Sequence, residues 1–192
     1  YMMVESLGDI SGAHFNPAVT LTLFVAAGLP YYKVPCYWAA QFAGAFAGGA
    51  LLFAGSPVDE DGTSLLVSGI AIPPHLTAGQ ALLWEFMGTL AIIVCVLFIA
   101  VRPVAHLIHP GFPVGLTVCF SIITAGPFTG AGINPARTLG SARYQHGFWE
   151  SRAGEHMYVY FVGPLLAALA GPALVWLIYG SEKSGMSLPK AA

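Results

Sequence analysis

The chain has 192 residues, of which 56% are hydrophobic and only 8% are charged. Soluble domains carry roughly a quarter charged residues, so this composition excludes a soluble globular domain and indicates a membrane protein. The net charge of -2 is small and the cationic residues are scattered, which argues against nucleic-acid binding. The three cysteines lie in apolar runs without CxxC spacing, so we expect no disulfide framework, no metal site and no cofactor.

The first elements in chain order are short. Tyr1–Leu7 is consistent with the end of a span whose start is missing. The tripeptide Asn16-Pro17-Ala18 follows, and Asn before Pro often begins a helix, because Asn caps the first free N–H groups while Pro needs no partner there. The next apolar run, Val19–Ala27, ends at Gly28 and Pro30 and is shorter than the ~20 residues of a spanning helix. We therefore predict a half-helix.

Four later segments are apolar enough to cross a bilayer. Three of them are long: Val34–Gly55, Ala81–Val101 and Met157–Tyr179. The fourth, Gly111–Ala125, is shorter than usual. We expect Val104–Ile108 to extend it if Pro110 and Pro113 are tolerated as kinks.

The connections between these spans differ in charge. The loop 56–79 contains acids but neither Lys nor Arg, so we place it outside. The opposite connections carry the cations that the positive-inside rule expects: Lys33, Arg102, Lys183 and Lys190. His106 and His109 flank the short span on this cytoplasmic side. They could bind a metal or sense pH, although a solvated loop is the simpler interpretation.

A second tripeptide, Asn134-Pro135-Ala136, lies 118 positions after the first. Its apolar run is broken within a few residues by Gly140 and Arg143, which predicts a second half-helix. An odd number of spans separates the tripeptides, so the two halves of the chain point in opposite directions. Inverted repeats with broken helices at mid-membrane are a known way to build a transport path. We therefore divide the chain into the remainder of a first repeat (1–79), a second repeat (80–180) and a cytoplasmic tail (181–192).

The flanks of both tripeptides resemble those of the major intrinsic proteins, the aquaporins and aquaglyceroporins. The matching segments are 11–20, 40–45, 85–89, 129–140 and 162–164. The resemblance implies an all-α membrane protein with an aquaporin-like inverted repeat of spanning helices and two re-entrant half-helices. It also implies a homotetramer with one pore in each subunit. Only fifteen residues precede Asn16, so the first repeat is expected to be truncated.

The resemblance implies roles for single residues of the pore. Asn16 and Asn134 would donate hydrogen bonds to passing water, while the opposed positive ends of the half-helices repel cations. Arg137 would be the cationic arm of an outer selectivity filter. The alternative for Arg137 is a snorkelling side chain beside the headgroups. Ile122 and Ala131 would form two other walls of the filter.

Three further residues are expected to support the pore. Glu85 is the only acid inside a long span, where a charge costs about 2.5–3.5 kcal/mol on insertion scales, so it must have partners. The resemblance implies that it accepts hydrogen bonds from the half-helix loops, and a proton relay is the alternative. Gln41 either bonds across helices or is a polar group shielded from lipid. His14 is a candidate for the inner mouth.

The expected function is a passive channel that conducts water and excludes protons and ions. Thr138, Ala142 and the aromatic pair Tyr160-Phe161 are typical of water-type members of the family. Ile122 and Ala131, however, leave a wider and more apolar wall than one containing His, which favours glycerol or other small neutral solutes.

A non-conducting subunit with a structural or partner-binding role is a third interpretation, because of the missing spans. We do not expect an enzyme, since no nucleophile, base and orienting residue converge. An ion-coupled transporter would need titratable groups along its path beyond Glu85. We expect a multi-pass protein of the lipid bilayer, with the plasma membrane as the first choice of location.

Overall fold

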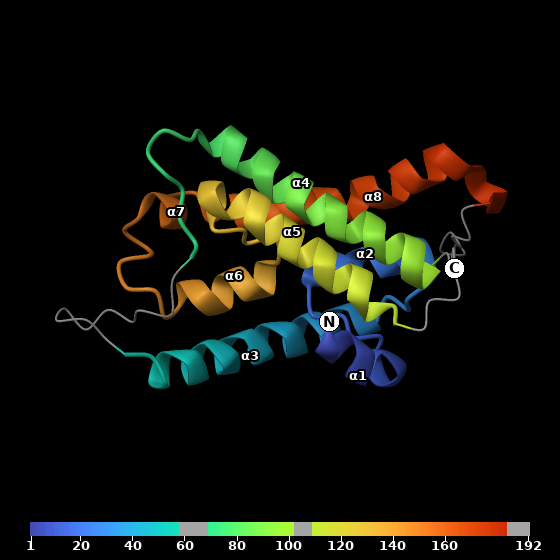
Figure 1. Ribbon diagram of the computed structural model, residues 1–192, viewed down its shortest axis with the longest axis horizontal. Coiled ribbons are helices and arrows are strands. Elements are labelled where there is room, and N and C mark those ends of the chain that lie inside the picture. Colours follow the sequence, from blue (N-terminus) through green and yellow to red (C-terminus); the bar gives the residue numbers. More distant parts are fainter. Residues whose placement is uncertain (58–68, 102–108, 184–192) are drawn as a thin grey trace.

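The computed structural model describes residues 1–57, 69–101 and 109–183, and the regular elements of these ranges are all helical (Figure 1). In chain order they are α1 (Met2–Ser11), α2 (Pro17–Ala27), α3 (Lys33–Ala54), α4 (Ala78–Val96), the π-helix η1 (Leu97–Val101), α5 (Gly111–Thr129), α6 (Pro135–Ala142), α7 (Arg152–Glu155) and α8 (Val159–Lys183). Four helices are long and apolar enough to cross a membrane: α3, α4 with part of η1, α5 and α8. The predicted all-α membrane fold is confirmed.

The start of α4 differs from its prediction by three residues, because α4 begins at Ala78 rather than Ala81. The cause is a capping box formed by Thr77 and Gln80. The Thr77 hydroxyl accepts from the Gln80 backbone N–H at 3.2 Å, and the Gln80 side chain accepts from the Thr77 backbone N–H at 2.9 Å. A polar residue pair therefore extends the helix beyond its apolar part.

The short fourth span is longer than predicted, since α5 runs from Gly111 to Thr129 over 19 residues. Pro113 lies in its first turn, where the N–H groups of a helix have no partner within the helix, so no hydrogen bond is lost there. The upstream extension Val104–Ile108 lies outside the described residues. The helix thus reaches spanning length by continuing past Ala125 instead.

Several sequence predictions concern residues that the structure does not describe. They include the acidic part of the loop 56–79, Arg102, His106 and Lys190. The helix α8 continues to Lys183, so the tail predicted from residue 181 begins inside this helix. His109 is described, and its Nδ1 lies 3.4 Å from Oε2 of Glu5. In the described ranges no three potential metal-ligating side chains gather around it or elsewhere.

Small residues bring the spans α4, α5 and α8 close together. A Cβ added to Gly163 of α8 would lie 2.9 Å from the Cβ of Glu85 on α4. Ala167 of α8 is fully buried. On another side of α4, the Ser121 hydroxyl of α5 donates to the carbonyl oxygen of Gly88 at 2.9 Å. These contacts join α4, α5 and α8 into a three-span bundle.

Each half-helix packs against a span of the other half of the chain (Figure 1). On α2, the Thr22 hydroxyl donates to the carbonyl oxygen of Ala168 in α8 at 3.2 Å. On α6, a Cβ added to Gly140 would lie 2.6 Å from the carbonyl oxygen of Ala45 in α3. Gly140 interrupts the apolar run of the sequence but lies inside α6, where it permits close packing, and the half-helix ends at Ala142, just before Arg143. Because each half-helix packs on the other half of the chain, the two halves form one bundle.

Candidate functional site

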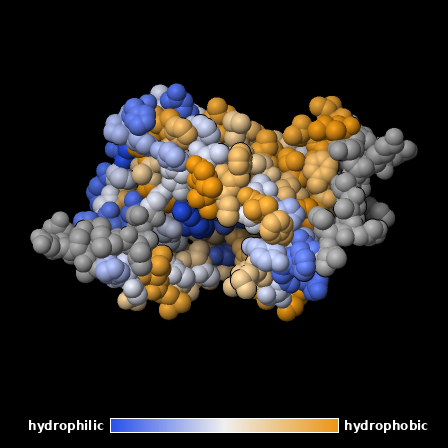
Figure 2. Space-filling view, in the orientation of Figure 1, coloured by the Kyte–Doolittle hydropathy of each residue, from blue (hydrophilic) through white to orange (hydrophobic). Residues whose placement is uncertain are grey.

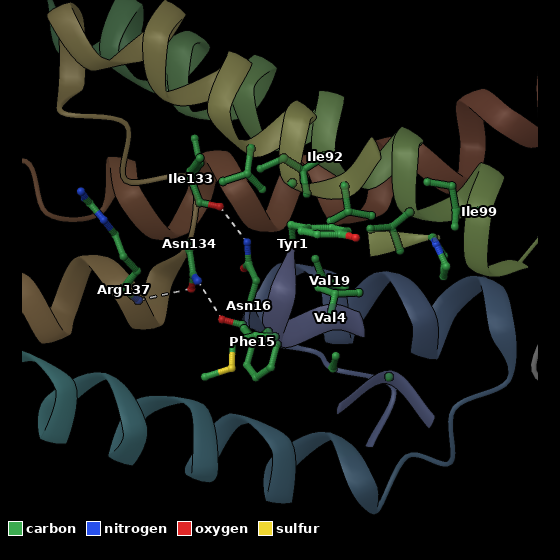
Figure 3. A pocket seen from close by; sticks show the side chains of 18 of the residues that line it. Tyr1, Val4, Phe15, Asn16, Val19, Ile92, Ile99, Ile133, Asn134 and Arg137 are labelled. Carbon is green, nitrogen blue, oxygen red and sulfur yellow. Dashed lines mark hydrogen bonds between the residues drawn. The ribbon is translucent and has the colours of Figure 1, made fainter. Parts of the chain in front are cut away.

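The two half-helices meet through reciprocal hydrogen bonds between their first residues and the opposite loops (Figure 3). The side-chain nitrogen of Asn16 donates to the carbonyl oxygen of Ile133 at 2.8 Å. The side-chain nitrogen of Asn134 donates to the carbonyl oxygen of Phe15, also at 2.8 Å. Phe15 and Ile133 each immediately precede an asparagine, so the contact has the symmetry of the sequence repeat. The N-termini of α2 and α6 are thereby held facing each other.

The same two asparagines cap their own half-helices. Oδ1 of Asn16 accepts from the backbone N–H of Ala18 at 2.9 Å. Oδ1 of Asn134 accepts from Ala136 at 3.0 Å and from Arg137 at 3.3 Å. The proline of each tripeptide occupies the first helical turn. Each amide nitrogen carries two hydrogens, and the opposite loop uses one, so one donor per asparagine remains for another acceptor.

Left-handed backbone turns place both tripeptides. Gly12 and Ala13 have φ values of 72° and 51°, and their counterparts Gly130 and Ala131 have 74° and 49°. Ile133 has a φ of 43° as well. Such values are uncommon for residues with a side chain and persist only where the surroundings impose them. The chain reverses at these turns between α1 and α2 in the first half and between α5 and α6 in the second.

Glu85 binds the loop that leads to Asn134. The carboxylate is fully buried in α4. Oε1 accepts from the Thr129 hydroxyl at 2.6 Å and from the backbone N–H of Gly132 at 2.8 Å, and Oε2 accepts from the N–H of Ile133. Both carboxylate oxygens are thus occupied by the loop. Charge-assisted bonds of this kind are the stronger class of hydrogen bond, so Glu85 fixes the backbone just before Asn134.

Gln41 makes a corresponding contact in the first half of the chain. Its side-chain nitrogen donates to the backbone carbonyl oxygen of His14 and, at 2.8 Å, to the hydroxyl of Thr20. The amide therefore joins α3 to α2 and the loop before it. The imidazole of His14 stacks on Tyr37, with ring centroids 4.6 Å apart, and does not line the cavity described below. The stacking turns the ring toward α3, and a role of His14 at the inner mouth stays a prediction.

A cavity of about 780 Å³ lies around the asparagine pair. Among the residues lining it are both asparagines and Arg137 (Figure 3). The other two predicted filter residues, Ile122 and Ala131, line it as well. Most of the remaining wall is apolar, with contributions from α1, α2, α4 and α5. Figure 2 shows a hollow in the middle of the face drawn in Figure 1, with hydrophilic and hydrophobic residues at its rim. Residues far apart in sequence thus share one cavity.

Arg137 brings an unused hydrogen-bond donor to this cavity. It follows the second tripeptide and lies on α6, the half-helix that begins at Asn134. Its Nη1 is buried and has no hydrogen-bond partner within the described part of the chain. A guanidinium stays charged at any relevant pH and has five donors. An uncharged solute with an oxygen atom could therefore be bound at this position.

One structural feature of the site was not recognised in the sequence. Residues 69–77, which we call the strap, precede α4 and cross the end of the bundle beside α7 (Figure 1). Gln145 and Arg152 bind backbone carbonyl oxygens of the strap. The first strap residue, Gly69, lies next to Arg137: a Cβ added to it would be 3.7 Å from Nη2. No local pattern signals these contacts, because the partners are more than 65 residues apart.

Spans packed around two half-helices that meet at their N-termini define a membrane protein built as an inverted repeat. The family model described as "Major intrinsic protein" matches residues 1–176. The chain belongs to the major intrinsic protein family.

Comparisons with individual proteins agree with this assignment. Aquaporin NIP2-1 of Oryza sativa subsp. japonica is 39% identical over 173 residues, which cover 88% of this chain and 53% of that protein. Aquaporin-2 of Rattus norvegicus is 34% identical over 186 residues, which cover 95% of this chain and 65% of that protein. The chain thus spans less than two thirds of either relative.

A solved structure supports the fold independently of close sequence similarity. The aquaglyceroporin from Plasmodium falciparum matches with a TM-score of 0.70 at 23% identity, covering 87% of this chain and 73% of the other. At this identity the match concerns the arrangement of helices alone. It agrees with the four spans and the paired half-helices described above.

Proposed function

We propose that this chain forms a passive pore that conducts water and excludes protons and other ions. The observation that carries the proposal is the reciprocal contact between Asn16 and Asn134 and the opposite loops. It places two helix N-termini, each with a partial positive charge of about half an elementary charge, face to face. Lining donors, an arginine and half-helix dipoles are the general determinants of selectivity in aquaporin-type pores, and this chain has all three.

The asparagine amides would orient water in the pore. Each amide nitrogen keeps one hydrogen that no acceptor among the described residues uses, and both asparagines line the cavity. A water oxygen that accepts these hydrogens must point its own hydrogens away from the half-helices. A continuous chain of donors and acceptors for proton transfer is then interrupted at this position. The positive helix ends add an electrostatic barrier to cations from both sides.

The alternative within the same class is a pore for glycerol or other small neutral solutes. The observation in its favour is that Ile122 and Ala131 line the cavity and offer only apolar surface beside Arg137. The residues typical of water-type members, Thr138 and Tyr160, are fully buried and do not line it. They would influence passage only through packing. Water remains the first proposal, and the solute range is tested separately.

The remaining proposals rest on family membership. We infer that four copies assemble, each with its own pore, and that the protein resides in the plasma membrane. We also keep the division into a first repeat over 1–79, a second over 80–180 and a cytoplasmic tail. Chemical cross-linking in the host membrane would reveal the assembly, and a ladder ending at four copies is the expected result.

Osmotic swelling of proteoliposomes tests the pore. The whole chain is expected to raise water flux above that of empty vesicles, while a pH-sensitive dye inside reports no added proton flux. Ile122→Trp places a large ring on the cavity wall and should lower the flux to that of empty vesicles. Ile123→Trp is the matched control, since Ile123 lies next to Ile122 on the same helix, is 75% exposed and does not line the cavity.

Three outcomes separate the hypotheses. Water flux that is blocked by Ile122→Trp but not by Ile123→Trp supports a pore through the described cavity. Flux that neither substitution changes would place the path elsewhere. A wild-type chain that folds in the vesicle membrane and conducts no more than the lipid alone would favour the third interpretation, a non-conducting subunit.

A further inference from the structure

The strap is held against the second half of the chain by buried apolar side chains. Ile70, Ile72 and Leu76 are 0%, 5% and 6% exposed. They belong to one core cluster with residues of α6, α7, α8 and the segment between α6 and α7, including Phe148 and Ala153. Such contacts keep the strap on the bundle. Because apolar attraction is non-directional, they do not by themselves set its position along the surface.

Two polar side chains supply that direction. The Gln145 side-chain nitrogen donates to the carbonyl oxygen of Ile70 at 2.9 Å. Nη1 of Arg152 donates to the carbonyl oxygens of Pro73 at 2.9 Å and Pro74 at 2.6 Å. Hydrogen bonds weaken steeply with misalignment, so together these three bonds fix the register of the strap. Both donors lie in the connection between the second half-helix and α8.

The start of the strap meets the site at two backbone positions. Gly69 has a φ of +114°, a conformation suited to glycine, and its added Cβ would be 3.7 Å from Nη2 of Arg137. Gly130, in the turn before the second tripeptide, has no room for a Cβ because the carbonyl of Gly69 occupies the space. The backbone N–H of Ala71 also donates to Thr129 at 3.3 Å. The strap thus lies beside the arginine and contacts the loop that carries the asparagine.

We propose that Arg152 and Gln145 are positioning residues for solute selection. They hold the strap in register, and the strap limits how far the guanidinium of Arg137 can move away from the cavity. This inference rests on the proposed pore function. When the register is lost, the guanidinium gains room, the constriction widens, and larger neutral solutes pass more readily relative to water.

The test is the ratio of glycerol permeability to water permeability in proteoliposomes that contain the whole chain. Arg152→Met keeps much of the side-chain length but removes both hydrogen bonds of Arg152 to the strap, and Gln145→Leu removes the single hydrogen bond of Gln145. Each is expected to raise the ratio by about threefold or more, a modest change for a size-selective site because the apolar anchors remain. Arg152→Lys, which retains a charged donor, should restore part of the wild-type ratio.

Arg143→Met is the matched control. Arg143 is exposed, lies 5.6 Å over the ring of Tyr144, and makes no hydrogen bond to the strap in the described residues. Arg143→Met removes a positive charge from the same connection as Arg152→Met does. Its ratio of glycerol to water permeability should nevertheless equal that of the wild type. A ratio that rises equally in Arg143→Met would show a charge effect and overturn the inference.

Hydrogen exchange at the backbone N–H of Ala71 provides a readout that does not depend on transport. In detergent, Arg152→Met should raise the exchange rate about tenfold, whereas Arg143→Met should leave it unchanged. If Arg152→Met does not fold, Gln145→Leu decides, because it removes a single hydrogen bond. Unchanged ratio and exchange in a folded variant overturn the inference while the pore proposal stands. A wild-type chain without water flux would instead contradict the pore proposal itself.

Discussion

Gly49 of α3 and Gly140 of α6 are in direct backbone contact, since a Cβ added to Gly49 would lie 2.7 Å from the carbonyl oxygen of Gly140. The same Cβ would be 2.8 Å from the ring of Tyr144. A tyrosine ring can rotate, but a carbonyl inside a helix cannot. This contact therefore determines how closely the half-helix that carries Arg137 can approach α3.

Gly49→Ala is expected to separate α6 from α3 and to destabilise the protein by about 1–3 kcal/mol, the usual cost of overpacking. Thermal unfolding in detergent measures the loss. Gly44→Ala is the control on the same helix, because nothing lies within 4 Å of the Cβ it would add. Equal melting temperatures for the two variants would show that the contact is not tight in solution.

Glu85→Gln is expected to destabilise the protein by at least about 2 kcal/mol, because an amide nitrogen would face backbone N–H groups that now donate to the carboxylate. Chemical unfolding followed by circular dichroism gives the change. Glu150→Gln removes an exposed acid instead and should stay within about 0.5 kcal/mol of the wild type. A Glu85→Gln protein of full stability would contradict the assigned hydrogen bonds to Gly132 and Ile133.

Asn16→Asp should keep the helix cap but replace the donating amide nitrogen by a carboxylate oxygen. In the wild type this nitrogen lies 2.8 Å from the carbonyl oxygen of Ile133, so two acceptors would then face each other. We expect lower stability and, in vesicles, a measurable leak of protons, because a carboxylate offsets the positive helix ends. Asn134→Asp should behave alike, since its contact to Phe15 has the same length. Proton fluxes equal to wild type in both variants would remove the electrostatic part of the mechanism.

Ile122→His should narrow the cavity and make its wall more polar, so that glycerol uptake falls while water flux is retained. Stopped-flow light scattering measures both permeabilities. Ile123→His controls for an added imidazole on α5 away from the cavity, and we expect it to change neither. Glycerol uptake that is unchanged by Ile122→His would refute the assignment of Ile122 to the filter.

Local rules account for much that the sequence predicted correctly. Asn16 and Asn134 each cap the helix they begin, and the cap depends only on the next three residues, so both half-helices were predictable. The start of α4 and the end of α5 were predicted less well. At α4 the polar capping box precedes the apolar run, and hydropathy alone does not detect it.

Contacts between distant segments were not predictable from the chain alone. Arg152 binds carbonyl oxygens almost eighty residues earlier in the chain. Every residue has a backbone carbonyl, so no sequence pattern marks the carbonyl oxygens that accept hydrogen bonds from a distant side chain. His14 shows the same limit, because its stacking on Tyr37 depends on where α3 packs.

The crossed asparagine contacts also bear on how the protein is made. The acceptor for Asn16 is synthesised 117 residues after its donor. Until then, the tip of the first half-helix would have unsatisfied polar groups inside the bilayer, each costing several kcal/mol. We therefore expect this segment to wait at the membrane surface during translation and to enter only when its later counterpart arrives, so that biogenesis ends with a joint insertion step.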